Sequence, residues 1–149
     1  MLQINTKAPD FTLPDEKGIP HTLSAYLGTW VLLYFYPKDD TPGCTKEACM
    51  LRDYKDAYKE NDLVVLGVSK DDSESHEAFI SKYKLPFTLL ADTNREVIEI
   101  YGASGTLFTK RISYLIDPNG IIQKVYEKVE PETHAAEVLR DVAMLKQNS

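Results

Sequence analysis

Trp30-Val-Leu-Leu-Tyr-Phe-Tyr36 is a run of seven apolar or aromatic residues that stops at Pro37. A continuous apolar run of this length, without alternation, is typical of a strand that is covered on both faces. Residues 63–68 are a second such run, and a helix is predicted between the two, from Thr41-Pro42 to about residue 61. Strand, helix and strand in this order predict a βαβ unit with parallel strands.

The segments on either side extend this unit. Residues 11–14 and 19–23 flank Asp15-Glu16-Lys17-Gly18 and predict an N-terminal β-hairpin. Further strands are predicted at 89–91, 111–116 and 121–129, and further helices at 73–83 (capped by Asp72 or Ser73), 94–101 and 134–146. Asp117-Pro118-Asn119-Gly120 is a strong turn signal, so the last two strands are predicted to be antiparallel. The pattern predicts an α/β, thioredoxin-like fold, with a mixed central β-sheet flanked by helices on both faces, in a single domain of residues 1–149.

Composition excludes several classes of protein. With 43% hydrophobic and 27% charged residues, the chain has ordinary globular composition. The net charge is −6 and the longest basic run is Lys110-Arg111, so no nucleic-acid partner is expected. The seven-residue apolar run is far shorter than the roughly 20 residues that cross a bilayer, and residues 1–5 lack the features of a signal peptide. We therefore expect a cytoplasmic protein without membrane association.

The two cysteines, Cys44 and Cys49, are too few for a disulfide scaffold or a thiolate zinc site. Their default interpretation is packing, because free cysteine usually behaves as a small hydrophobe. The context favours reactivity instead. Thr41 is a good N-cap and Pro42 suits the first helical position, which places Cys44 in the first turn. There the unpaired N–H groups and the helix dipole favour an ionised thiolate.

A helical wheel separates the two cysteines. Cys44 shares the apolar stripe with Ala48, Leu51, Tyr54 and Tyr58, whereas Cys49 falls among Lys46, Asp53, Asp56 and Glu60. Residues five apart in a helix have Cα atoms roughly 8.6 Å apart, and a disulfide needs less than about 7 Å. The pair can bond only if the helix unwinds, which indicates a transient redox couple. The preceding Asp39 and Asp40 would oppose a thiolate unless they are solvated.

Phe35-Tyr-Pro-Lys-Asp-Asp-Thr-Pro-Gly-Cys-Thr-Lys-Glu-Ala-Cys49 resembles the active-site segment of the peroxiredoxins. It carries the P-x-x-x-T-x-x-C pattern as Pro37, Thr41 and Cys44. The second cysteine five residues later is similar to the bacterioferritin-comigratory-protein, or peroxiredoxin Q, group. Further matches at 8–13, 66–69, 86–92, 111–117 and 129–139 extend the resemblance over nearly the whole chain.

The resemblance implies a thiol-dependent peroxidase that reduces hydrogen peroxide and organic hydroperoxides. It makes Cys44 the nucleophile, which becomes a sulfenic acid, and Cys49 the resolving cysteine, which closes an intramolecular disulfide. A dithiol reductant such as thioredoxin would restore both thiols. No cofactor is implied.

The resemblance also implies roles for the residues around the nucleophile. Thr41 would turn its hydroxyl toward the sulfur and the peroxide, in addition to capping the helix. Pro37 would shape the pocket, in addition to ending the strand. The N–H groups of Gly43 and Cys44 would donate to the peroxide, and Arg111 would place a cation beside the thiolate. From the residue alone, a solvated arginine at a strand end is an equally good interpretation of Arg111.

Other features stay open. Glu47 either orients the Thr41 region or is an ordinary helix-face residue. Residues 101–110 depart from the Gly/Lys-rich loop usual in the family, so the peroxide preference is undecided. No motif of a larger peroxiredoxin's C-terminal extension follows Leu145, so we expect a monomer, with a weak dimer as the alternative.

His21, His76 and His134 are scattered and share no metal-ligand spacing. We expect surface or capping roles for them and no metal site, while a Cys–His dyad stays open. Two other functions also stay open: a thiol–disulfide oxidoreductase acting on proteins, and a noncatalytic thioredoxin-like binding or chaperone module. Neither needs Thr41, Pro37 or the C-x4-C helix.

Overall fold

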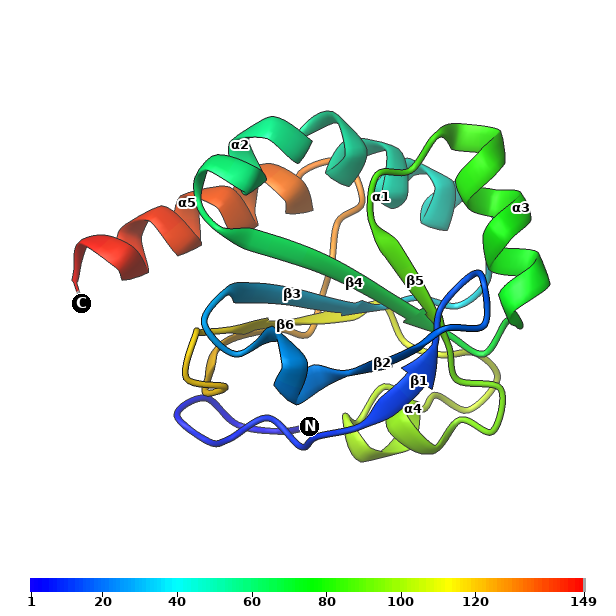
Figure 1. Ribbon diagram of the computed structural model, residues 1–149, viewed down its shortest axis with the longest axis horizontal. Helices are drawn as coiled ribbons and strands as arrows, with labels where there is room; N and C mark the ends of the chain where they lie inside the picture. Colours follow the sequence, from blue (N-terminus) through cyan, green and yellow to red (C-terminus); the bar gives the residue numbers. More distant parts are fainter. Residues whose placement is uncertain (149) are drawn as a thin grey trace.

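The computed structural model describes residues 1–148; Ser149, the last residue of the predicted domain, lies outside the described residues. Its centre is a five-stranded sheet in the order β5-β4-β3-β6-β7 (Figure 1). The strands are β3 (Trp30–Phe35), β4 (Leu63–Ser69), β5 (Thr88–Ala91), β6 (Ile112–Ile116) and β7 (Ile122–Tyr126). β3, β4 and β5 are parallel, whereas β6 is antiparallel to both β3 and β7. The predicted mixed sheet is therefore confirmed.

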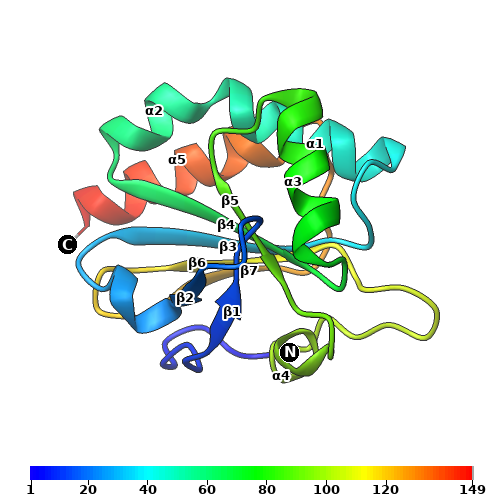
Figure 2. The ribbon, with the colours of Figure 1, turned by 45° about the vertical axis from the view of Figure 1, so that its right-hand side comes forward.

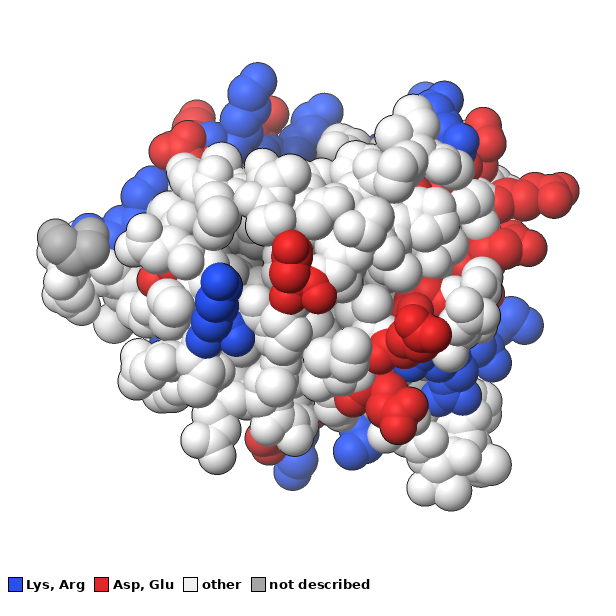
Figure 3. Space-filling model, turned by 60° about the horizontal axis from the view of Figure 1, so that its bottom comes forward, with Lys and Arg blue, Asp and Glu red and all other residues white. Residues whose placement is uncertain are grey.

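Helices cover both faces of the sheet, but unequally (Figures 1 and 2). One face carries α1 (Pro42–Asp53), α2 (Lys55–Glu60), α3 (Ser73–Tyr83) and α5 (His134–Gln147). The other carries α4 (Glu96–Ile100), the short 3-10 helix η1 (Leu23–Tyr26) and the hairpin of β1 (Thr12–Pro14) and β2 (Pro20–Thr22). In a view toward this second face, Asp and Glu gather toward the right-hand side, and much of the remaining surface is uncharged (Figure 3).

The central strand β3 divides the core into two layers. Leu32 and Tyr34 point into the layer beneath α1, α3 and α5. Val31, Leu33 and Phe35 point into the opposite layer, which includes α4 and the hairpin. Because successive side chains of a strand alternate between faces, a strand buried on both must be apolar throughout. This explains why all six residues of β3 are buried.

Two predicted boundaries differ from the structure by more than two residues. The helix predicted to reach residue 61 is interrupted at Tyr54, whose N–H donates to the Leu51 carbonyl (3.2 Å). Tyr58 Oη then anchors α2 by donating to the Ala135 carbonyl in α5 (2.7 Å). The apolar periodicity continues through the break, so the wheel could not reveal it. The strand predicted over 121–129 ends at Tyr126, because the chain turns toward α5, with the Glu130 carbonyl accepting from His134 N (3.0 Å).

No helix in the described part of the chain has the length and apolar surface that crossing a membrane requires.

Candidate active site

The sheet places a loop and a helix start at the carboxyl end of β3. α1 begins at Pro42, and Thr41 occupies the N-cap position, as predicted. Its side chain does not cap the helix, however. Thr41 Oγ1 donates to the Lys38 carbonyl (2.9 Å) and so closes the loop before α1. The hydroxyl oxygen keeps its lone pairs, so it remains an acceptor for a further donor.

The two cysteines have different environments within α1, which is continuous around both. Cys44 is 1% exposed and packs in the core with Ala48 and Leu51, as the wheel predicts. Cys49 is partly exposed, and both are free thiols. This arrangement agrees with the spacing argument, because an intact helix keeps the two residues too far apart to bond.

Arg111, immediately before β6, reaches across to α1. Its Nη2 donates to Cys44 Sγ (3.4 Å), and its Nη1 donates to Glu47 Oε1 (2.8 Å). The interpretation of Arg111 as a solvated strand-end residue is therefore wrong. Glu47 is also no ordinary helix-face residue: it is buried and pairs with Arg111 rather than with Thr41. The sequence signal for the burial of Glu47 was its position three residues after Cys44, which puts both residues on one side of the helix.

Arg111 and its acidic neighbours affect one another's pKa. Burial raises the pKa of Glu47 to about 7, although the neighbouring Arg111 opposes the shift. Burial disfavours the charged form of Arg111, but Cys44 and Glu47 outweigh it and raise the pKa of the guanidinium. Within residues 1–148, the buried Glu47 Oε2 and Tyr34 Oη have no hydrogen-bond partner. The guanidinium of Arg111 therefore lies between two acidic side chains, those of Cys44 and Glu47, near the start of α1.

Gly43 leaves the space for the contact between Arg111 and Cys44. A Cβ atom at Gly43 would lie 2.8 Å from Arg111 Nη2. Pro37 is half-buried in the loop that leads from β3 toward α1. The structure thus brings Cys44, Gly43 and Arg111 into one group, with Pro37 and Thr41 in the adjoining loop and Cys49 one turn along α1.

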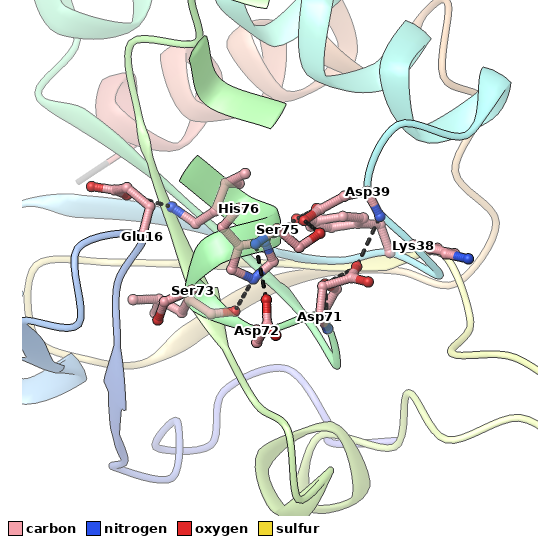
Figure 4. A network of polar contacts seen from close by, with 12 residues as sticks. Glu16, Lys38, Asp39, Asp71, Asp72, Ser73, Ser75 and His76 are labelled. Atoms are coloured by element: carbon pink, nitrogen blue, oxygen red, sulfur yellow. Dashed lines mark hydrogen bonds and ion pairs between the residues drawn. The ribbon is translucent and has the colours of Figure 1, made fainter. Parts of the chain in front are cut away.

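The sequence leaves open whether Asp39 is solvated, and the structure shows that it is buried, with 7% of its surface exposed. Its Oδ1 accepts from Tyr36 Oη (2.6 Å), and its Oδ2 lies 2.8 Å from Ser75 Oγ and 2.7 Å from His76 Nδ1 in α3 (Figure 4). The carboxylate can be buried because each oxygen has hydrogen-bond partners. Its charge is directed toward α3 rather than toward Cys44.

Asp40, the next residue, also faces α3 but in an exposed position. Its carboxylate accepts from Lys82 Nζ (2.7 Å) and from Tyr83 Oη (2.8 Å). These two partners lower the pKa of Asp40. The loop before the cysteine helix is therefore joined to both ends of α3.

The expected surface or capping roles of the histidines were wrong for His76 and His134, because both are buried and neither is the N-cap residue of its helix. His134 Nε2 lies 2.9 Å from Ser113 Oγ, and burial lowers its pKa. His21 is half-buried and lies 2.7 Å from Asp15 Oδ2. In the part of the chain that the structure describes, the hydrogen-bond partners of all three rings are groups other than cysteine.

Comparisons with known proteins identify the family and the fold of the chain. A model described as the AhpC/TSA family matches residues 4–125. Peroxiredoxin Q, chloroplastic, from Sedum lineare is 46% identical over 142 residues, which are 93% of this chain and 76% of that protein. PrxQ from Xylella fastidiosa has a similar structure, with a TM-score of 0.93, 28% identity and 98% coverage of both chains. The bacterioferritin comigratory protein of Xanthomonas campestris, whose structure concerns alkyl peroxide reduction, has a TM-score of 0.85, 28% identity and 90% coverage of both chains.

The family match spans β3, α1 and β6, and so it includes both cysteines and the arginine that contacts Cys44. The structural neighbours also share the mixed sheet over most of the chain. The chain therefore belongs to the AhpC/TSA family, in its peroxiredoxin Q and bacterioferritin comigratory protein group, and is a thiol-dependent peroxidase.

Proposed function

We propose that Cys44 is the nucleophile of this peroxidase. Its sulfur attacks one oxygen of the hydroperoxide, and the other oxygen leaves with the electron pair of the O–O bond and takes up a proton, as water or an alcohol. Cys44 is thereby oxidised to a sulfenic acid. The observation that carries this proposal is the Arg111 Nη2 donor 3.4 Å from Sγ at the first turn of α1.

The surrounding groups can stabilise the charge that moves during this step. Arg111 supplies a fixed cation beside the thiolate and the departing oxygen, where preorganised donors are most effective. The N–H groups of Gly43 and Cys44 lie in the first turn, where they have no intrahelical partners and can donate to the peroxide. Thr41 Oγ1 already donates to Lys38, so we assign it as an acceptor for the peroxide O–H. Pro37 would shield the entrance from one side.

Cys49 is the resolving cysteine in this proposal. Its thiolate attacks the sulfur of the Cys44 sulfenic acid, the S–S bond forms, and the hydroxyl leaves as water after taking up a proton. The first turns of α1 must unwind for this step, since about 8.6 Å separates residues five apart in a helix. A dithiol protein of the thioredoxin type would then reduce the disulfide by thiol–disulfide exchange.

The substrates we propose are hydrogen peroxide and organic hydroperoxides. Leu107 and Phe108 are exposed by 78% and 67% in the loop that ends at Arg111. This loop is the long extension between α4 and β6 in Figure 2. Exposed apolar side chains in the loop that leads to Arg111 would favour the organic part of an alkyl hydroperoxide, which is the substrate class studied for the Xanthomonas campestris relative.

The test is intact mass after one equivalent of hydrogen peroxide, with reduced wild type beside Cys49→Ser and Cys44→Ser. Wild type should lose two hydrogens within minutes. Cys49→Ser should gain one oxygen and react with dimedone at Cys44, and Cys44→Ser should not change. If wild type and Cys49→Ser both stay unchanged, Cys44 is not an activated nucleophile, and rapid reduction of insulin disulfides would then identify a protein-disulfide oxidoreductase.

A further inference from the structure

The loop before the catalytic helix is held at Asp39 through both its backbone and its side chain. Asp39 N donates to Asp71 Oδ2 (2.8 Å), which also accepts from Ser69 Oγ (2.7 Å) at the end of β4. The Asp39 side chain meets Ser75 and His76 at the start of α3, as described above. Two residues after Asp39, Thr41 occupies the N-cap position of α1. Figure 4 shows these side chains converging between the loop and α3.

The hydrogen bonds around His76 indicate where its ring protons lie. Its Nε2 lies 3.0 Å from the Leu90 carbonyl, which can only accept, so Nε2 carries a proton. Its Nδ1 lies 2.7 Å from Asp39 Oδ2. The Asp39 carboxyl already faces two hydroxyl donors, Tyr36 Oη and Ser75 Oγ. Burial raises the pKa of Tyr36 well above its ordinary value, so the phenol keeps its proton and donates.

These bonds are best satisfied by an anionic Asp39 that accepts from three side chains and a cationic His76 that donates from both nitrogens. His76 is fully buried, so this ion pair is shielded from solvent. The ligand atoms of Asp39, Asp71 and His76 lie within 4.8 Å of one another. A ring nitrogen that carries a proton cannot bind a metal ion, however, so the same assignment argues against a cation site here.

We propose that His76 is a positioning residue for peroxide reduction. As a buried imidazolium it holds Asp39, and Asp39 fixes the loop that sets Thr41 and Gly43 beside Cys44. This inference rests on the proposed role of Cys44. We call the contact between His76 and Asp39 the tether. It precedes α1 and contacts neither cysteine. It therefore positions the groups of the first half-reaction and does not hinder the unwinding that brings Cys49 to Cys44.

The consequence is a separation of the two half-reactions. A shift of about 1 Å in a reacting group can cost on the order of 100-fold in rate. Loss of the tether should therefore slow the attack on peroxide by about 10- to 100-fold. Disulfide closure should stay within about twofold of wild type, because it depends on the unwinding of α1, which the contacts of Asp39 do not hold. A residue that only supports global stability would slow neither step, or both together.

The first measurement uses unmodified protein. Nitrogen-15 spectra of the reduced wild type at neutral pH should show a proton on both ring nitrogens of His76. An Nδ1 without a proton would overturn the ion-pair assignment. Binding of Zn²⁺ to the reduced protein with loss of the His76 Nδ1–H signal would overturn it as well.

The second measurement compares His76→Gln with His21→Gln. His21 also pairs with an aspartate at 2.7 Å, but in the hairpin. The rate with hydrogen peroxide is measured in the Cys49→Ser background, and disulfide closure in the otherwise wild-type chain, both by rapid quenching and mass. His76→Gln should slow the reaction with hydrogen peroxide but not disulfide closure. His21→Gln should slow neither reaction. Ser75→Ala, which removes one donor to Asp39, replaces His76→Gln if that variant does not fold.

Unchanged first rates in His76→Gln, or equal losses in both rates, would overturn the positioning role while leaving the proposed function intact. If the Cys49→Ser protein with native His76 fails to react with peroxide, the proposed function itself fails. The nitrogen-15 result still decides the charge of His76 in that case.

Discussion

A Cβ atom placed on Gly43 would lie 2.8 Å from Nη2 of Arg111, the atom that donates to Cys44 Sγ. The position therefore needs a residue without a side chain, even though it lies inside a helix. Glycine is among the poorest helix formers. Glycine here weakens the helix locally, but it allows the guanidinium of Arg111, immediately before β6, to approach the first turn of α1.

Gly43→Ala should separate activity from stability. The backbone of Gly43 is helical, so alanine can adopt it without backbone strain and favours the helix by up to about 1 kcal/mol. The flexible end of Arg111 must move away, and we expect the rate of Cys44 with hydrogen peroxide to fall by about tenfold. Stopped-flow kinetics and thermal unfolding of the same sample check both. A wild-type rate in Gly43→Ala would show that the position of Nη2 is unimportant.

Arg111→Lys should be much more damaging than its retained charge suggests. The guanidinium donates to Cys44 and Glu47 at the same time through two different nitrogens, and a single ammonium cannot reproduce this fork. We expect the second-order rate with hydrogen peroxide to fall by about 100-fold. The matched control is Lys110→Gln, which removes a neighbouring exposed cation. Equal losses in both variants would mean that general positive potential, rather than this contact, promotes the reaction.

The parts of the fold that could be predicted depend on local patterns. The run from Trp30 to Tyr36 has one simple explanation, a strand covered on both faces, and β3 is such a strand. The helical wheel likewise placed Cys44 in the core because the apolar stripe of α1 repeats every three or four residues. The break at Tyr54 left that stripe in phase, so the periodicity carried no sign of it.

The parts that could not be predicted depend on distant partners. The local sequence could not decide whether Asp39 is solvated, because its burial requires His76, 37 positions further along the chain. His76 looked like a surface residue for the reciprocal reason. A buried ion pair is stable only when both members are present, and neither member alone has a sequence pattern that identifies the other. Glu47 is a similar case, since its pairing with Arg111 depends on the packing of β6 against α1.

Glu47 predicts a specific dependence of stability on pH. Its pKa rises from an ordinary 4.5 to about 7 on folding, chiefly through burial. Its favourable contribution is therefore fully present below about pH 4.5 and is lost as the pH rises through 7, because the unfolded chain releases this proton first. The loss amounts to about 3 kcal/mol. Urea unfolding of the reduced protein at pH 5, 6, 7 and 8 should show the decline.

Glu47→Gln should flatten this decline, since glutamine does not titrate but can still accept from Arg111. Glu60→Gln, at an exposed position of α2, should retain the wild-type slope and serves as the control. Identical slopes for wild type and Glu47→Gln would show that Glu47 ionises with its ordinary pKa inside the fold.

Disulfide formation between Cys44 and Cys49 should melt α1 selectively. The helix spans Pro42–Asp53 without interruption, and both thiols are free in it. A disulfide closes to less than about 7 Å between Cα atoms, so the bonded form cannot keep the helical turns between the cysteines. We expect faster amide hydrogen exchange across residues 42–53 after oxidation by one equivalent of hydrogen peroxide. The separate helix α2 is held on α5 by Tyr58 and should keep its protection.

The same exchange experiment on oxidised Cys49→Ser separates unwinding from oxidation itself. This variant stops at the sulfenic acid, so its α1 should stay as protected as in the reduced protein. Protection that is unchanged in oxidised wild type would contradict an intramolecular Cys44–Cys49 bond and would point to bonding between chains, which non-reducing electrophoresis detects. Protection lost in both proteins would place the trigger for unwinding at the sulfenic acid. In that case the helix opens before Cys49 attacks, and the disulfide only traps the open form.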